Sequence, residues 1–595
     1  MAPSNTMPGV SGRGGRGCPF LFARHAAIAL LASLIPIVCV AQVVPEAATT
    51  RIKREPVVAK RHMVVAAHPL ASEAGFAVLE RGGLAIDAAI AALMVLNVVE
   101  PQSSGIGGGG FLLHYSARDK KLRVFDGRET APKEATANLF LDAEGKPLRF
   151  FSAVVGGRAV GAPGLVPMLE MAHRALQGKH AWQSLFAKAI DHAEHGFAVS
   201  PRLHALVTRD SFLRDDPSAR MLFFTESGQP LPVGARLQNR TLAATLRAIA
   251  AEGAQALRAG PIARDIVSTV RNHPTNPGRL SAVDLESYRP VERAPLCAPY
   301  RAWRVCGMPP PSAGGVTVLQ ILKLLENRNI AALAPESLMA AHLFAEAGRL
   351  GYADRNAYIA DPAFVTMPVE QLLAPAYLAQ RSALIDPRRS MGRAQAGQLA
   401  NLERKRVDAD ETPSTTHLSV IDAEGNAVAL SASIENAFGA RLMTRGFLLN
   451  NQLTDFAFAP EEAGNRVANR VEGGKRPRSS MAPTMVFDRE GRLVLMLGSP
   501  GGAWIINFVA RALVATLDWG LDLQAAFDLP HSGSRNNATE LEQGTSAVRL
   551  RDGLEQLGHT VQIIDMPSGL HGIQRHADGW LGAADPRREG VPRGR

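Results

Sequence analysis

Three side chains that could perform acyl transfer stand at positions that one β-hairpin would bring together. We place a three-residue loop between Asp422 and Asn426, where a glycine can supply the positive φ that such a loop needs. Continuing this register pairs Thr415 with Ser433. Side chains alternate along a strand, so Ser433 and Glu435 would both project beside Thr415. The alternatives are a β-bulge, which would shift the register, and an ordinary strand, in which threonine is common.

Thr415 would need a base, because an unassisted threonine hydroxyl is a poor nucleophile. The α-amino group of an N-terminal threonine can serve, since its ordinary pKa of about 7.7–8.0 leaves much of it neutral at about pH 7–8. This chemistry requires a cut before Thr415, and the polar, charged segment 401–413 precedes that point. No Gly-X-Ser-X-Gly motif supplies a competing serine. His417 would share a face with Thr415, but we interpret it as structural.

Two later segments carry groups suited to anions. Leu495 to Gly502 is predicted to be a strand that ends in glycines before an apolar helix over 503–517. The amides of Gly501 and Gly502 could point at a developing oxyanion, although glycine before a helix is commonplace. Lys475 to Ser480 could bind an anion, and a solvated basic turn is the alternative.

The apolar spacing predicts the elements that must position these groups. Ala71–Leu79 and Ala85–Val98 have helical periodicity, and residues 160–350 are predicted to be mostly helical. The run Gly107–Gly110 leads into a predicted strand, Phe111–Tyr115. It lacks the lysine of a phosphate-binding loop and does not open a helix, so it indicates close backbone packing rather than nucleotide binding.

A short motif, Asp-X-Glu-Gly, recurs along the chain. It begins at Asp142, Asp422 and Asp488. Each copy puts glycine where a three-residue hairpin loop needs a positive φ, so we predict three such loops.

Composition excludes several classes of protein. Of the 595 residues, 46% are hydrophobic and 20% charged, which favours a globular protein over a disordered chain or a coiled coil. Residues 1–41 hold Arg13, Arg16 and Arg24 and no acid, so the remainder carries 10 − 3 = +7 of the net charge. No basic run is interleaved with aromatic residues, which argues against nucleic acid as a partner.

The first 41 residues are typical of a signal peptide. A basic stretch precedes the apolar run Ala26–Val40, and Ala41 is a suitable small residue for cleavage. The run is shorter than the about 20 residues that span a bilayer. We expect export to the periplasm or medium, and an uncleaved membrane anchor is the alternative.

Two cysteines remain after such a segment is removed. Cys297 and Cys306 could form a disulfide across a hairpin, as an exported protein allows, but their spacing alone does not fix the geometry. No histidine pair stands nearby at ligand spacing, so we expect no metal site there.

Several motifs in order resemble the γ-glutamyltranspeptidase family. The resemblance covers about Met63 to Asp585, nearly the whole mature chain. Its motifs are Gly107-Gly108-Gly109-Gly110-Phe111, Asp126-Gly127-Arg128-Glu129, Ala353-Asp354-Arg355, Thr415-Thr416-His417-Leu418-Ser419-Val420, residues 447–456, Arg476-Pro477-Arg478-Ser479-Ser480-Met481 and Gly498-Ser499-Pro500-Gly501-Gly502.

The resemblance implies an α/β fold, the four-layer αββα sandwich of N-terminal-nucleophile hydrolases. It also implies a precursor that cuts itself into a large subunit, 42–414, and a small catalytic subunit, 415–595, which associate as a heterodimer. The implied activity is cleavage of γ-glutamyl amides such as glutathione, with transfer to water, amino acids or dipeptides. No cofactor and no metal are implied.

The resemblance also implies a role for each site residue. Thr415 would be the nucleophile with its own amine as base, Ser433 would orient that amine, and Gly501 and Gly502 would supply the oxyanion amides. The substrate α-carboxylate would be held by Arg128, Ser479 and Ser480. The α-ammonium would be held by Glu435, Gln452 and Asp455.

The chain departs from the family pattern in three places. Ser433 stands where the family usually has threonine, which keeps the hydroxyl, and Glu435 replaces an asparagine seen in many members. The segment 457–474 is shorter than in members whose loop covers the site and has no tyrosine. An open cleft would admit larger substrates and water, so we expect hydrolysis to be favoured over transfer.

Three rival functions remain open from the sequence. A glutaryl (cephalosporin) acylase would act on substrates without an α-ammonium, which Glu435, Gln452 and Asp455 argue against. A poly-γ-glutamate hydrolase would suit an open cleft. An inactive binding protein of the cell envelope would not cut itself.

Overall fold

The computed structural model describes residues 51–399, 414–462 and 464–595. The predicted signal peptide, 1–41, and the charged segment 401–413 lie outside the described residues. Within the described part of the chain, no helix is long and apolar enough to cross a membrane.

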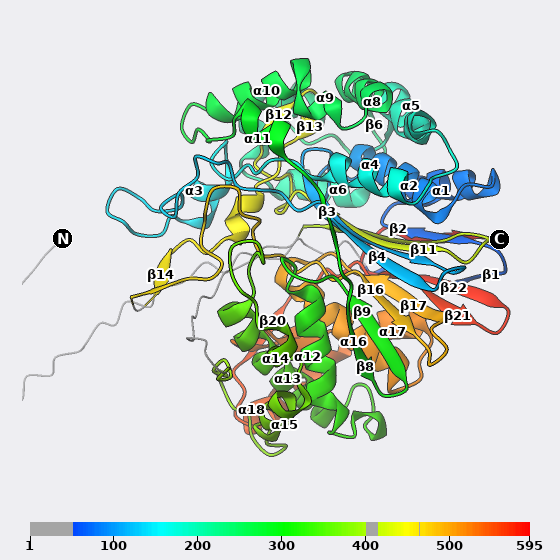
Figure 1. Ribbon diagram of the computed structural model, residues 1–595, viewed down its shortest axis with the longest axis vertical. Helices are drawn as coiled ribbons and strands as arrows, with labels where there is room; N and C mark the ends of the chain where they lie inside the picture. The colour runs from blue at the N-terminus through cyan, green and yellow to red at the C-terminus, as the bar shows by residue number, and fades with distance from the viewer. Residues whose placement is uncertain (1–50, 400–413, 463) are drawn as a thin grey trace, which may run out of the picture. The chain divides into compact units, whose positions relative to one another are not determined.

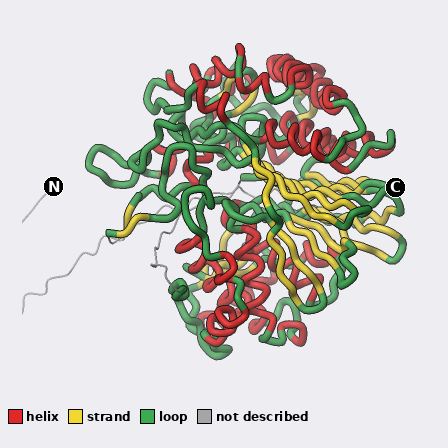
Figure 2. Tube along the Cα trace, viewed as in Figure 1, coloured by secondary structure: helices red, strands yellow, loops and turns green. Residues whose placement is uncertain are grey.

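Two seven-stranded antiparallel sheets lie next to one another, and helices cover their outer faces (Figures 1 and 2). The strand order of the first sheet is β23 (Val591–Gly594), β2 (Met63–Ala66), β10 (Thr416–Ile421), β11 (Ala427–Ser433), β3 (Gly109–Ser116), β4 (Lys121–Asp126) and β7 (Val291–Arg293). The strand order of the second is β1 (Val57–Ala59), β22 (Gly579–Ala584), β21 (His571–His576), β17 (Leu493–Gly498), β16 (Thr484–Phe487), β9 (Trp303–Gly307) and β8 (Leu296–Tyr300).

Helices from both predicted subunits form the outer layers. Those that contact the first sheet are α1 (Pro69–Glu80), α2 (Ala85–Val99) and α4 (Leu165–Ala175). Those that contact the second are α12 (Gly314–Glu326), α16 (Ile505–Leu517) and α17 (Leu523–Asp528). This layering confirms the predicted αββα sandwich (Figure 1).

The remaining elements surround these layers. The other helices are α3 (Phe150–Val154), α5 (Ala187–His195), α6 (Pro201–Arg209), α7 (Pro217–Phe223), α8 (Arg240–Glu252), α9 (Gln255–Arg258), α10 (Gly260–Arg271), α11 (Ala282–Ser287), α13 (Leu338–Tyr358), α14 (Val369–Leu372), α15 (Pro375–Ala383) and α18 (Arg551–Gln556). The short strands are β5 (Phe197–Ala198), β6 (Arg236–Leu237), β12 (Met443–Thr444), β13 (Phe447–Leu448), β14 (Glu461–Glu462), β15 (Asn465–Arg466), β18 (Ser532–Ser534), β19 (Thr539–Glu542) and β20 (Val561–Ile564).

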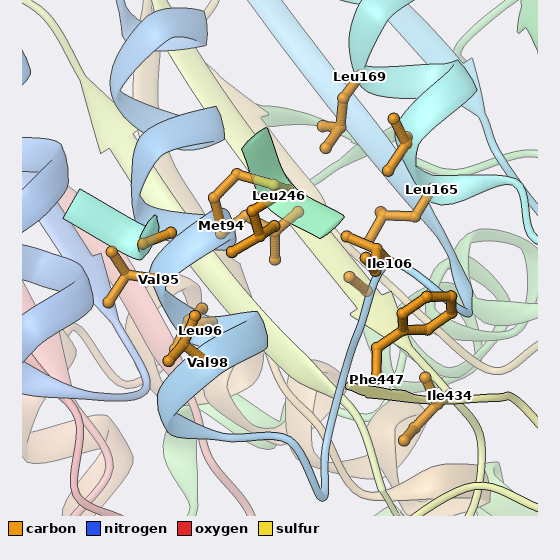
Figure 3. Close-up of a cluster of buried hydrophobic side chains, with 14 of the residues drawn as sticks. Met94, Val95, Leu96, Val98, Ile106, Leu165, Leu169, Leu246, Ile434 and Phe447 are labelled. Carbon is orange, nitrogen blue, oxygen red and sulfur yellow. The ribbon is translucent and has the colours of Figure 1, made fainter. Parts of the chain in front are cut away.

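The first sheet buries side chains on both of its faces. In β3, Leu112 belongs to the core beneath the helices, whereas Phe111 and Leu113 belong to the core shared with the second sheet. Period-two alternation produces this division. Helix α2 is buried along its whole length and packs Met94 and Leu96 into the first core (Figure 3). The strands are therefore fixed from both sides, which makes them a rigid support for residues at their ends.

The sequence-predicted elements agree with the structure. The two N-terminal helices are α1 and α2, and the strand after the glycine run is β3. The glycines that end the three Asp-X-Glu-Gly motifs all have positive φ: Gly145 at 75°, Gly425 at 82° and Gly491 at 76°. In each loop the aspartate amide donates to the carbonyl four residues later, so all three loops are confirmed.

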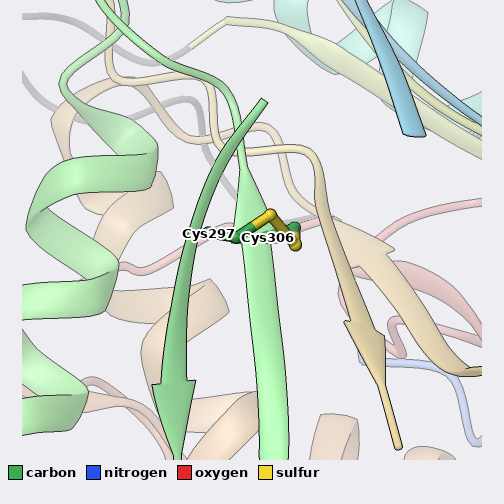
Figure 4. The surroundings of a disulfide bond; sticks show 2 residues. All are labelled: Cys297 and Cys306. Atoms are coloured by element: carbon green, nitrogen blue, oxygen red, sulfur yellow. A yellow bond between two sulfur atoms is a disulfide. The ribbon is translucent and has the colours of Figure 1, made fainter. Parts of the chain in front are cut away.

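The two cysteines in the described part of the chain are bonded. Cys297 in β8 faces Cys306 in the antiparallel strand β9, and their sulfur atoms form a disulfide (Figure 4). The sequence allowed this disulfide without fixing its geometry, and the structure shows that it links two strands at the edge of the second sheet.

The glycine run lies where neighbouring backbone leaves no space for a side chain. A methyl group at Gly108 would lie 2.1 Å from the carbonyl oxygen of Ser433, and one at Gly107 would lie 2.3 Å from that of Leu448. The prediction of close packing rather than nucleotide binding agrees with these distances.

Gly108→Ala should therefore destabilise the fold, because the added methyl group must push the end of β11 away. We expect a loss of about 1–3 kcal/mol, the usual cost of overpacking, and a lower midpoint of thermal unfolding in differential scanning calorimetry. Gly105→Ala is the matched control, since its methyl group would have its nearest neighbour at 3.6 Å. Equal midpoints for the two variants would contradict this explanation.

Candidate active site

The β10–β11 hairpin has the predicted register. Thr416 pairs with Ala432 and Leu418 with Leu430, and the register is regular along the whole ladder. One residue beyond this ladder, the hydroxyl of Thr415 lies 3.3 Å from that of Ser433. The hairpin therefore brings together two hydroxyls that are 18 residues apart in the chain.

The peptide bond before Thr415 is intact, and both hydroxyls face it. Thr415 Oγ1 donates to the carbonyl oxygen of Ser414, and Ser433 Oγ donates to the same oxygen at 2.9 Å. The amide of Glu435 donates to Ser433 Oγ at 2.9 Å, which orients that hydroxyl. Thr415 is buried, with 3% of its surface exposed. The Thr415 hydroxyl, the Ser414 carbonyl oxygen and the Ser433 hydroxyl are thus in contact.

Most of the predicted site residues line one pocket with an empty volume of about 260 Å³. The predicted residues among its lining are Arg128, Thr415, Ser433, Glu435, Gln452, Asp455, Ser479, Ser480 and Gly502. Gly501 directly precedes Gly502, which opens the 3₁₀ turn Gly502–Trp504 before α16. Ser414, Met481 and Ile505 also line the pocket and were not predicted.

Arg128 is held just beyond the end of β4. Its Nε donates to the carbonyl oxygen of Pro477 at 3.0 Å, and Nη2 donates to that of Arg478 at 2.6 Å. Nη2 also donates to the carboxylate of Asp455, which forms a buried ion pair. These contacts fix the guanidinium at the pocket wall and use the hydrogens of Nε and Nη2, which leaves those of Nη1 to meet a ligand carboxylate.

The acidic part of the pocket comes from two segments. Asp455 lies in the 3₁₀ turn Gln452–Asp455, and Gln452 Nε2 donates to its carboxylate at 2.8 Å. Glu435 follows β11 and accepts a hydrogen bond from Asn451 Nδ2. Two carboxylates, Arg128 and two serines in one pocket suit a ligand head that carries both charges.

A further carboxyl group lies next to Arg128. Glu129 is fully buried, with an oxygen 3.8 Å from Arg128 Nη1, and burial raises the pKa of Glu129 to about 8. Because that pKa lies above neutral, Glu129 is mostly protonated at about pH 7 and adds little negative charge to the wall. Sequence patterns do not predict this pKa shift, because it comes from burial.

His417 is a structural residue of the hairpin. Its ring nitrogens are hydrogen-bonded to Ser431 at 2.8 Å and to Ser419 at 3.2 Å. Burial holds the pKa of His417 well below its ordinary value, so the ring is neutral. It does not line the pocket, in agreement with the interpretation from the sequence.

Two arginines hydrogen-bond to residues that line the pocket, and neither arginine was predicted as a site residue. Arg588 Nη1 donates to the carbonyl oxygen of Thr415 at 3.3 Å. Arg355 Nη2 donates to Ser480 Oγ at 2.7 Å. Only Arg355 stood in a recognisable motif, and neither contact follows from spacing along the chain.

One group of possible metal ligands occurs among the described residues, away from the pocket. His342, Glu346 and His559 have ligand atoms within 4.8 Å of one another. The two histidines are hydrogen-bonded to each other at 2.7 Å, and Glu346 accepts from Arg349 and Ser390. The contact between the two histidines ties α13 to the segment before β20.

The sequence profile of the gamma-glutamyltranspeptidase family matches residues 71–594. The glutathione hydrolase proenzyme of Bacillus subtilis is 35% identical over 549 residues, which cover 90% of this chain and 91% of that protein. An acylase ACY 1 proenzyme of Pseudomonas is 37% identical and covers 92% and 96%. The crystal structure of a cephalosporin acylase from Bacillus halodurans superimposes with a TM-score of 0.80 at 26% identity, covering 93% and 99%. The chain therefore belongs to the gamma-glutamyltranspeptidase family of hydrolases and transferases.

Proposed function

We propose that this chain is an autoprocessing γ-glutamyltranspeptidase and glutathione hydrolase whose nucleophile is Thr415. The observation that carries the proposal is a single pocket lined by Thr415, Ser433, Arg128 and two acidic side chains, Glu435 and Asp455. The relatives named glutathione hydrolase proenzyme support the same activity and the need for a cut.

The contacts around the intact bond support self-cleavage before Thr415. The Thr415 hydroxyl adds to the Ser414 carbonyl carbon, and Ser433, 2.9 Å from the carbonyl oxygen, stabilises the negative charge that develops there. The carbon–nitrogen bond breaks, the amine takes the hydroxyl proton, and water hydrolyses the resulting ester. The products are a large subunit, 42–414, and a small subunit, 415–595, which remain associated because their strands share both sheets.

The freed amine of Thr415 then acts as the base for substrate chemistry. It takes the proton of the Thr415 hydroxyl, which attacks the γ-carbonyl carbon. Gly501 and Gly502 face the oxyanion with their amides, and the ammonium returns the proton to the departing amine. A γ-glutamyl ester on Thr415 remains until water or the amine of an amino acid or dipeptide attacks it.

The charges of the pocket suit the amino-acid head of a γ-glutamyl group. Its α-carboxylate lies against Arg128, Ser479 and Ser480. Its α-ammonium lies against Glu435, Gln452 and Asp455. Without substrate, Arg128 and Asp455 are paired with each other. When a zwitterionic head binds, its carboxylate can pair with Arg128 and its ammonium with Asp455, so neither buried charge loses its partner.

Similarity to acylases makes glutaryl substrates the second candidate. A glutaryl group has the carboxylate but not the ammonium. Binding it would place a methylene group where the ammonium would meet Glu435 and Asp455, so these carboxylates would gain no opposite charge from the ligand. The acidic side of the pocket therefore favours γ-glutamyl compounds.

Export is supported by two features. The N-terminal segment 1–41 has the pattern of a signal peptide. The disulfide between Cys297 and Cys306 is a bond typical of oxidising compartments. We propose that the enzyme works in the periplasm or outside the cell.

Thr415→Ala should leave one uncut, inactive chain, because it removes the attacking hydroxyl. Ser433→Ala should slow self-cleavage by about 10²–10³-fold, the usual effect of removing one oxyanion donor. Ser433→Thr, which keeps the hydroxyl, is the matched control and should cut normally. Gel electrophoresis of purified protein over time measures all three, and normal cutting by Ser433→Ala would remove Ser433 from the mechanism.

Glu435→Gln and Asp455→Asn should change the choice of substrate. Each removes a charge that meets the ammonium, and a hydrogen bond to a charged group is worth about 1.5–3 kcal/mol. We expect KM for γ-glutamyl-p-nitroanilide to rise about 10-fold or more, and KM for glutaryl-p-nitroanilide to stay level or fall. Steady-state kinetics with both compounds measures this. An equal rise in KM for both compounds would show that the carboxylates do not bind the ammonium.

A further inference from the structure

The residue before the proposed cut is held by its own side chain. Ser414 is 1% exposed, and its Oγ donates to the carbonyl oxygen of Gln102 at 2.8 Å. Gln102 lies in the turn that follows α2 and is itself buried. Its carbonyl oxygen also accepts a hydrogen bond from the amide of Phe438 at 3.1 Å. Ser414 is therefore held by a backbone group whose own place is fixed by a contact between the two predicted subunits.

The two residues that flank the bond to be cut are held at three points. Besides the contact with Gln102, Ser433 Oγ donates to the carbonyl oxygen of Ser414 at 2.9 Å. Arg588 Nη1 donates to the carbonyl oxygen of Thr415 at 3.3 Å. The three partners come from the turn after α2, the end of β11 and the segment before β23. The peptide group between them is thus restrained on both of its sides.

Self-cleavage needs such a restraint. The Thr415 hydroxyl must reach the carbonyl carbon of the residue directly before it, which closes a small ring through the backbone nitrogen. Contacts outside the reacting atoms can set the rate of such a step by holding the geometry. The Ser414 side chain and carbonyl group branch from the same α-carbon. With the side chain held by Gln102 and the next residue held by Arg588, the carbonyl group has little room to turn away from Thr415.

We propose that Ser414 is a positioning residue for self-cleavage, acting through its hydrogen bond to the Gln102 carbonyl. It holds the carbonyl carbon within reach of the Thr415 hydroxyl while Ser433 contacts the oxygen. In the step itself, the Thr415 oxygen bonds to that carbon, the carbon–nitrogen bond breaks and the amine takes the hydroxyl proton. The inference rests on the proposed function, because it assumes a cut before Thr415. It assigns to the turn after α2 a part in processing the precursor.

The rate of cutting in pulse-labelled full-length chains tests this role. Ser414→Ala removes the donor, and we expect self-cleavage to slow about 10-fold, as the loss of one hydrogen bond from the reacting geometry would cause. Ser414→Thr keeps a hydroxyl and should cut within about 3-fold of the wild-type rate. Gel electrophoresis after increasing chase times gives the rate constants. A Ser414→Ala chain that cuts at the wild-type rate would overturn the inference.

Ser72→Ala is the matched control for the loss of a buried hydroxyl. Ser72 lies in α1, is fully buried and donates to the carbonyl oxygen of Val591 at 2.7 Å, outside the pocket. Its cutting rate should stay within about 2-fold of wild type. In a Thr415→Ala background, where chains stay uncut, Ser414→Ala should lower the midpoint of thermal unfolding no more than Ser72→Ala does. Equal slowing of the cut by both variants would contradict the inference, because a general loss of stability would then explain it.

Ser414→Cys supplies the comparison if Ser414→Ala does not fold, because a thiol is only a weak donor. It should cut more slowly than Ser414→Thr, and equal rates for the two would argue against a positioning hydrogen bond. Failure of the proposed function has a different signature, since the wild-type chain itself would then stay uncut.

Discussion

The register of the β10–β11 hairpin is the constraint on which the rest of the site depends. It is fixed at one end by the Asp422–Asn426 loop and at the other leaves Thr415 beside Ser433. Because strand side chains alternate, a slip of one residue would put the two hydroxyls on opposite faces of the sheet. Burial of the first sheet on both faces opposes such a slip, since apolar and polar positions would exchange.

Close backbone packing also fixes where the other residues of the pocket lie relative to this hairpin. Gly108 lets the chain approach the Ser433 carbonyl, and the strands that follow deliver Arg128 beyond the end of β4. The second sheet delivers the glycines after β17, which open the turn before α16. Residues from both predicted subunits therefore meet at one pocket because the sheets are built from strands of both.

Local rules of the sequence were sufficient for the hairpin and insufficient for what surrounds it. The glycine loops, α1, α2 and the pairing of Thr415 with Ser433 follow from periodicity and turn chemistry, which act over a few residues. The roles expected for Arg128, Glu435 and Asp455 came from family motifs, and the structure brings these side chains into one pocket. The contacts of Arg355 and Arg588 and the raised pKa of Glu129 depend on tertiary packing, which no spacing along the chain encodes.

The central claim is that Thr415 carries the γ-glutamyl group between donor and acceptor. The direct measurement is the mass of the small subunit after rapid mixing with γ-glutamyl-p-nitroanilide and acid quenching, followed by fragmentation to locate the modified residue. The account predicts a small subunit that begins at Thr415 and gains the mass of one γ-glutamyl group on that residue. A subunit that turns over substrate without an adduct, or with the adduct on another side chain, would contradict it.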